Sequence, residues 1–208
     1  MIWATLLLIC VSGYVAAKFF SLTNKRGRLK FLGLTIAAAI FTVMQFSVFL
    51  DYLMVDSNVT SASEFIVEWG HVISLSFVLS SLAIFIRESK PVFAQFPMIY
   101  TALPLLIIIS YILVQDTYAI KTWLIIIYQG GAIIVALLMY SVYTYRRTKY
   151  AFILGGVILF LISYILYWGV SEIQDSFQWI WKLLVGFAMT LSIFGYQQTE
   201  KEIDVNTI

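Results

Sequence analysis

Hydrophobic residues in this chain gather in seven long apolar stretches that short polar turns separate. A helix needs roughly 20 apolar residues to cross about 30 Å of hydrocarbon, and a backbone in lipid must satisfy its own hydrogen bonds. The uninterrupted runs lack the alternation of a membrane barrel. The pattern therefore predicts an all-α polytopic membrane protein, a bundle of seven transmembrane helices. The expected spans are residues 2–20, 31–53, 66–86, 93–114, 121–145, 150–169 and 178–197.

Composition supports the membrane interpretation and limits the domain organisation. Of 208 residues, 62% are hydrophobic and only 12% are charged, whereas about half of an ordinary soluble domain is apolar. Seven spans use nearly the whole length, so we expect one transmembrane domain, residues 1–198, and a short cytoplasmic tail, residues 199–208. The net charge of +2 gives no indication of nucleic-acid binding. The single cysteine, Cys10, excludes a disulfide framework and a thiolate metal cluster.

The charged turns alternate in sign along the chain and predict its orientation. Eleven of the thirteen Lys and Arg residues lie on one side of the predicted membrane, and only Lys121 and Lys182 lie on the other. The basic side is expected to be cytoplasmic, which places the N-terminus outside and the C-terminus in the cytoplasm. The eleven are Lys18, Lys25, Arg26, Arg28, Lys30, Arg87, Lys90, Arg146, Arg147, Lys149 and Lys201.

Residues within the spans indicate where helices pack and where the membrane surface lies. Small residues permit close contact between helices, and they occur in the last three spans. They are Gly130, Gly131, Gly155, Gly156, Gly186, Thr190 and Gly195. Tyr and Trp residues at the span ends, such as Tyr143 and Tyr145, are expected to anchor the protein at the membrane interface.

Polar side chains inside the spans concentrate near the outer face, and we expect any binding site to lie there. Counted from that face at 1.5 Å per residue, Gln45 and Gln129 lie at a depth of ~12 Å, His71 at ~8 Å and Lys182 at ~6 Å. The inner half of each span carries far fewer polar groups. Buried polar groups are costly in hydrocarbon unless they are paired or hydrated. The candidate ligand-binding residues are Gln45, Glu68, His71, Ser74, Gln129, Tyr164 and Lys182.

The third span contributes three of these candidates. Glu68, His71 and Ser74 recur at three-residue steps and so share one helix face, which we expect to face the bundle. A hydrogen-bonded structural role for His71 is the alternative. Because the chain has one histidine, bis-histidine haem binding and multi-histidine zinc sites are excluded. We expect no metal and no cofactor.

The layout resembles the seven-helix sensor modules found N-terminal to bacterial histidine kinases and diguanylate cyclases. The similar features are a basic first turn, a second span that ends in residues 49–53 (Phe-Leu-Asp-Tyr-Leu), an acidic entry to the third span and an Arg-to-Pro turn over residues 87–91. The resemblance implies a prokaryotic cytoplasmic membrane. It also implies signalling. After Tyr196 only twelve residues remain, so we expect no attached output domain and therefore a separate signalling partner, in the membrane or the cytoplasm.

Three functions fit the sequence. The first is a receptor-like or sensory protein that contacts membrane lipids and binds a small or lipidic ligand in an outward-facing polar pocket. The second is a non-catalytic subunit of a larger membrane complex. The third is a lipid-modifying enzyme in which Glu68 and His71 act as base and orienting residue. The chain carries no catalytic signature, so we favour a non-enzymatic function and place the receptor first.

Overall fold

A computed structural model of the chain describes residues 2–26, 29–54, 57–89, 99–114, 118–169 and 178–205. Among these residues, all but Met54, Val114 and Arg147 lie in helices, which confirms the all-α class. The elements are α1 (Ile2–Arg26), α2 (Leu29–Leu53), α3 (Ser57–Ser89), α4 (Ile99–Leu113), α5 (Tyr118–Arg146), the 3-10 turn η2 (Thr148–Tyr150), α6 (Ala151–Gly169) and α7 (Gln178–Val205).

Six of these helices are long and apolar enough to cross a membrane, as expected of an integral membrane protein. They are α1, α2, α3, α5, α6 (with η2) and α7. The fourth predicted span corresponds to α4, which has 15 described residues. Residues 93–98, where that span was expected to begin, lie outside the described residues. The count of seven crossings and the orientation therefore stay predictions.

Two helices extend well beyond the apolar stretches that predict them. Helix α3 begins at Ser57, nine residues before the expected start of the third span, and α7 continues to Val205. A helix that leaves hydrocarbon keeps its backbone hydrogen bonds, so hydropathy does not mark its end. The first part of the predicted tail is therefore a continuation of α7.

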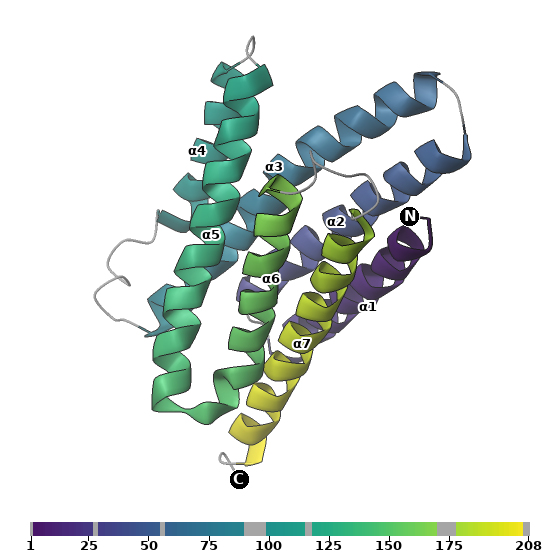
Figure 1. Cartoon of the computed structure of the whole chain (residues 1–208). Coiled ribbons are helices and arrows are strands. Elements are labelled where there is room, and N and C mark those ends of the chain that lie inside the picture. The colour runs from purple at the N-terminus through teal and green to yellow at the C-terminus, as the bar shows by residue number, and fades with distance from the viewer. Residues whose placement is uncertain are drawn as a thin grey trace. The chain divides into compact units, whose positions relative to one another are not determined.

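The chain forms two compact units, residues 2–132 and residues 133–208. In the first unit α1 packs on α2, α2 on α3, and α3 on α4 (Figure 1). The Thr42 hydroxyl donates to Ser12 Oγ across the α1–α2 contact, at 2.9 Å. Gly70 on α3 lets the Met44 side chain of α2 approach its backbone.

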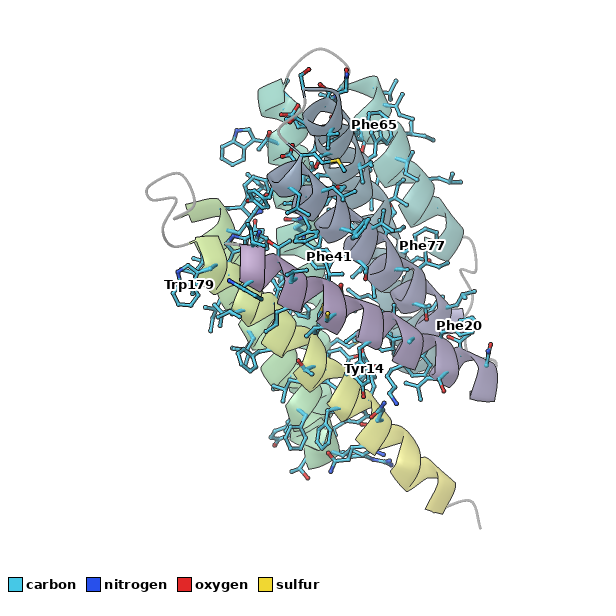
Figure 2. The ribbon with its side chains drawn as sticks, turned by 90° about the vertical axis from the view of Figure 1, so that its right-hand side faces the viewer. Tyr14, Phe20, Phe41, Phe65, Phe77 and Trp179 are labelled. Carbon is cyan, nitrogen blue, oxygen red and sulfur yellow. The ribbon has the colours of Figure 1, made fainter. Side chains whose placement is uncertain are left out.

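The outer surface of the first unit is apolar and aromatic. Tyr14 and Phe20, labelled in Figure 2, lie on α1, and each is about half exposed. Exposed side chains of this kind suit a lipid environment, in which burying them would bring no hydrophobic gain.

In the second unit α6 packs on α7, and both contact η2 (Figure 1). Glycines make this contact close. A Cβ at Gly156 would meet the Ala188 carbonyl oxygen at 2.9 Å and the Ser192 side chain, and one at Gly195 would meet the Ile153 backbone nitrogen at 2.9 Å. The prediction of small-residue contacts is thus confirmed for α6 and α7. It is wrong for Gly131 on α5, where an added Cβ would meet no atom of the structure within 4 Å.

Candidate functional site

One carboxylate links three helices of the first unit. Glu68 on α3 accepts a hydrogen bond from the Tyr111 hydroxyl of α4 at its Oε1 atom. Lys121 Nζ, in the first turn of α5, donates to the same oxygen at 3.1 Å. A lysine and a tyrosine hydroxyl around one carboxylate make charge-assisted hydrogen bonds, which are stronger than neutral ones. Glu68, three turns from the start of α3, therefore links that helix to the end of α4 and the start of α5.

Aromatic rings and the Lys121 ammonium pack around Tyr111, the tyrosine that donates to this carboxylate. The Lys121 ammonium lies 5.1 Å from the centroid of the Tyr111 ring, within the range of a cation–π contact. The Trp69 ring meets Tyr111 edge to face at 5.6 Å, and Phe65 lies 6.2 Å from Trp69. Figure 2 labels Phe65, which lies two turns into α3. Beneath the carboxylate, Tyr111 is 3% exposed and forms a buried apolar core with Val72 and Ile107.

A second polar layer lies one turn further along α3. Gln129 Nε2 of α5 approaches His71 Nδ1 at 3.4 Å. Tyr128 and Ser110 share a hydrogen bond of 3.1 Å between α5 and α4. Within the described residues, no group of three or more His, Cys, Asp or Glu side chains could hold a metal ion. We call Glu68, His71, Tyr111, Lys121 and Gln129 the Glu68 cluster.

Ser74 and Gln45 have different surroundings, although both were predicted as ligand-binding residues. Ser74 Oγ donates to the Ala37 carbonyl oxygen of α2 at 3.2 Å, so it links α3 to α2. Gln45 is 6% exposed, and its Oε1 has no hydrogen-bond partner among the described residues. It lies three residues from Thr42, whose hydroxyl contacts α1, and residues three apart share a helix face.

Replacing Gln45 with leucine is expected to stabilise the protein by roughly 1–3 kcal/mol, because the change removes a buried acceptor that lacks a partner. Thermal unfolding in a non-ionic detergent would measure the shift. Gln129→Leu is the matched comparison. It should destabilise, because it deprives His71 of its contact with the Gln129 amide. A fall in stability for Gln45→Leu as large as that for Gln129→Leu would contradict the expectation.

The remaining two predicted site residues, Tyr164 and Lys182, belong to the second unit. Lys182 on α7 is 3% exposed, and its ammonium lies 5.6 Å from the centroid of the Trp181 ring. The Trp181 carbonyl oxygen accepts from Ser163 of α6 at 3.1 Å, and its ring contacts Tyr167 at 4.9 Å. Lys182 therefore lies among residues that join α6 to α7.

The sequence interpretation missed a cluster of tyrosines in the second unit, at the end predicted to be cytoplasmic. Tyr140 of α5 and Tyr196 of α7 are buried, and their hydroxyls are hydrogen-bonded to each other. The Tyr143 and Tyr150 rings lie 5.4 Å apart beside them. The expectation that polar groups concentrate near the outer face was incomplete. The three-residue step from Tyr140 to Tyr143 places both on one helix face. That spacing is the sequence feature from which the tyrosine cluster could have been predicted.

Over the described residues, the structure is thus that of a helical protein in which six helices can span a membrane and a polar cluster links α3, α4 and α5. Comparisons of the chain with known protein families, with characterised proteins and with solved structures found no match.

Proposed function

We propose that this protein is a receptor-like membrane protein that binds a small or lipidic ligand at the Glu68 cluster. The observation that supports the proposal most directly is that the Glu68 carboxylate is partly exposed and has acceptor capacity left for further hydrogen bonds. Three helices meet at it, yet its side chain is 41% exposed. Both hydrogen bonds reach Oε1, and among the described residues none is donated to Oε2. A carboxylate can accept up to about four hydrogen bonds, so Glu68 can accept more from a ligand.

The charge pattern supports an outward-facing site. With the basic turns in the cytoplasm, the start of α3 and the start of α5 would both face the outside. The resemblance to bacterial sensor modules supports a sensory function at this end. Lys121 and Gln129 lie on α5, a continuous helix that ends at Arg146 in a basic turn. A ligand that displaces Lys121 from Glu68 would break a contact that holds α5 to α3, and a separate partner would detect the resulting shift of α5 at the basic turn.

Mass spectrometry of the protein purified in a mild detergent tests this function. The wild-type chain should carry a small molecule or lipid in a near-stoichiometric amount. The variant Glu68→Gln should lose it while keeping its helical content. The matched control is Glu64→Gln, which alters an exposed carboxylate one turn earlier on α3.

Two results would count against the proposal. One is a folded wild-type protein that carries no enriched compound from any membrane source. The other is a compound that Glu68→Gln retains in full. A second protein that copurifies in equal amount, with no small molecule, would instead favour the function of a subunit in a larger complex.

A further inference from the structure

The Glu68–Tyr111 pair already holds a cation, and that cation belongs to the chain. The Lys121 ammonium contacts the carboxylate at 3.1 Å and lies over the Tyr111 ring at 5.1 Å. A carboxylate beside an aromatic face is the environment that recognises organic ammonium ions, because both groups attract positive charge and the ring also accepts methyl groups. Trp69 and Phe65 extend the aromatic surface next to it.

We propose that the Glu68–Tyr111 pair is a binding site for an organic ammonium ion, and that Lys121 occupies it when no ligand is bound. The inference rests on the proposed function and names the class of ligand. The bound group would be a primary or quaternary ammonium, either on a free small molecule or on a lipid headgroup. Its charge would replace that of Lys121 at Glu68, so binding conserves the charge balance of the site.

The positions of the two charged side chains make the exchange feasible. Lys121 is 25% exposed and Glu68 is 41% exposed, and an ion pair that water reaches contributes little to stability. Lysine has a flexible four-carbon stem and a strongly hydrated ammonium group, so Lys121 can move into water at the membrane surface. Tyr111 cannot follow, because it is buried. Its hydroxyl would hold Glu68 in place for the incoming cation.

Titration with tetramethylammonium chloride tests the site directly. The protein in a non-ionic detergent is titrated against sodium chloride of equal ionic strength, and binding is followed by calorimetry or by tryptophan fluorescence. Lys121→Met should bind about tenfold more tightly than wild type, because removing a competitor raises the binding-competent fraction. Glu68→Gln should show no saturable binding.

Matched variants separate the site from general effects of charge. Lys18 also lies over a tyrosine ring, that of Tyr14 at 5.3 Å, but within the described residues no carboxylate pairs with it. Lys18→Met should bind tetramethylammonium as wild type does. Glu64→Gln should also leave binding unchanged, since Glu64 is an exposed carboxylate of the same helix.

The unaltered protein provides a second measurement that does not depend on how the variants fold. Acylation of lysines by an amine-reactive reagent, read by mass spectrometry, should be slow at Lys121 because its ammonium is paired. Tetramethylammonium should accelerate labelling of Lys121 several-fold and leave Lys18 unchanged. Equal acceleration at both lysines would mean that the salt acts on the whole protein.

Changing the lipid of the nanodisc shows whether the ammonium group belongs to a lipid headgroup or to a free small molecule. Phosphatidylethanolamine and ethanolammonium are amines that also consume the reagent, so labelling of Lys121 is measured as its ratio to labelling of Lys18 in the same sample. In nanodiscs of phosphatidylethanolamine this ratio should be higher than in nanodiscs of phosphatidylglycerol if the ligand is a headgroup. An equal ratio in the two lipids, together with a higher ratio in ethanolammonium chloride, would identify a free amine. No effect of tetramethylammonium, ethanolammonium or phosphatidylethanolamine on Lys121, with unchanged affinity in Lys121→Met, would overturn the inference. The proposed function would survive that outcome if a compound without an ammonium group still copurified and was lost in Glu68→Gln.

Discussion

Replacing Gly156 with valine should destabilise the second unit by about 1–3 kcal/mol or more, the usual cost of overpacking a close contact. The new Cβ would lie 2.9 Å from the Ala188 carbonyl oxygen and 3.2 Å from the Ser192 backbone nitrogen. Both are backbone atoms of α7, so α7 must move as a whole to make room. In a membrane this cost is not offset by a hydrophobic gain, because close packing itself holds helices together.

The control for Gly156→Val is Gly131→Val on α5. A Cβ at Gly131 meets nothing within 4 Å, so its expected effect is near zero. The loss of stability in Gly70→Ala should lie between those of the other two variants, since the atoms nearest the new Cβ would belong to the flexible side chain of Met44. Unfolding by increasing fractions of dodecyl sulfate in mixed micelles would rank the three variants. Equal losses at Gly156 and Gly131 would show that the close α6–α7 contact does not determine the result.

Substituting Glu68 by leucine should cost roughly 1–3 kcal/mol of stability, chiefly because it removes the acceptor of a buried tyrosine hydroxyl. Tyr111 is 3% exposed and donates to Glu68. The loss of the ion pair with Lys121 should cost less, because that side chain is 25% exposed and exposed ion pairs contribute little to stability. Thermal unfolding of the unliganded protein would measure the change.

A double-mutant cycle assigns that loss to its cause. Adding Tyr111→Phe to Glu68→Leu removes the hydroxyl that donates to Glu68 in the wild type, so the double variant should lose less than the two single losses added together. Glu64→Leu, which alters an exposed carboxylate one turn earlier on α3, should be close to wild type. If the stability losses of Glu68→Leu and Tyr111→Phe simply added in the double variant, the result would contradict a hydrogen bond between the Tyr111 hydroxyl and Glu68.

Much of the fold could be predicted from hydropathy. Helix α2, Leu29–Leu53, lies within two residues of the expected span 31–53, and α5 and α6 agree about as closely with theirs. The predictions fell short where helices leave hydrocarbon. Ser57 to Glu64 is too polar to be recognised as a span, yet it begins α3, because the backbone continues its hydrogen bonds in water. The same reason extends α7 through residues 199–205.

The candidate site was predicted in part. The three-residue step from Glu68 to His71 placed both on one face of α3, and both face α5 through Lys121 and Gln129. The same spacing includes Ser74, but the Ser74 hydroxyl donates a hydrogen bond to a backbone carbonyl of α2. A helix turns by about 100° per residue, so each step of three residues falls about 60° short of a full turn, and the two steps from Glu68 to Ser74 move the side chain about 120° around the helix axis. Periodicity cannot tell which neighbouring helix each position meets.

The sequence alone determined the class of this protein, because the membrane requires apolar helices and each helix is encoded by its own stretch of residues. It also determined which residues are polar within those helices. Only the tertiary structure decided which of them meet. For Lys121 the sequence predicted only the side of the membrane, whereas the packing of α3, α4 and α5 places it on Glu68 beside Tyr111. Contacts between residues 43 and 53 positions apart depend on how helices pack, and no local pattern carries that information.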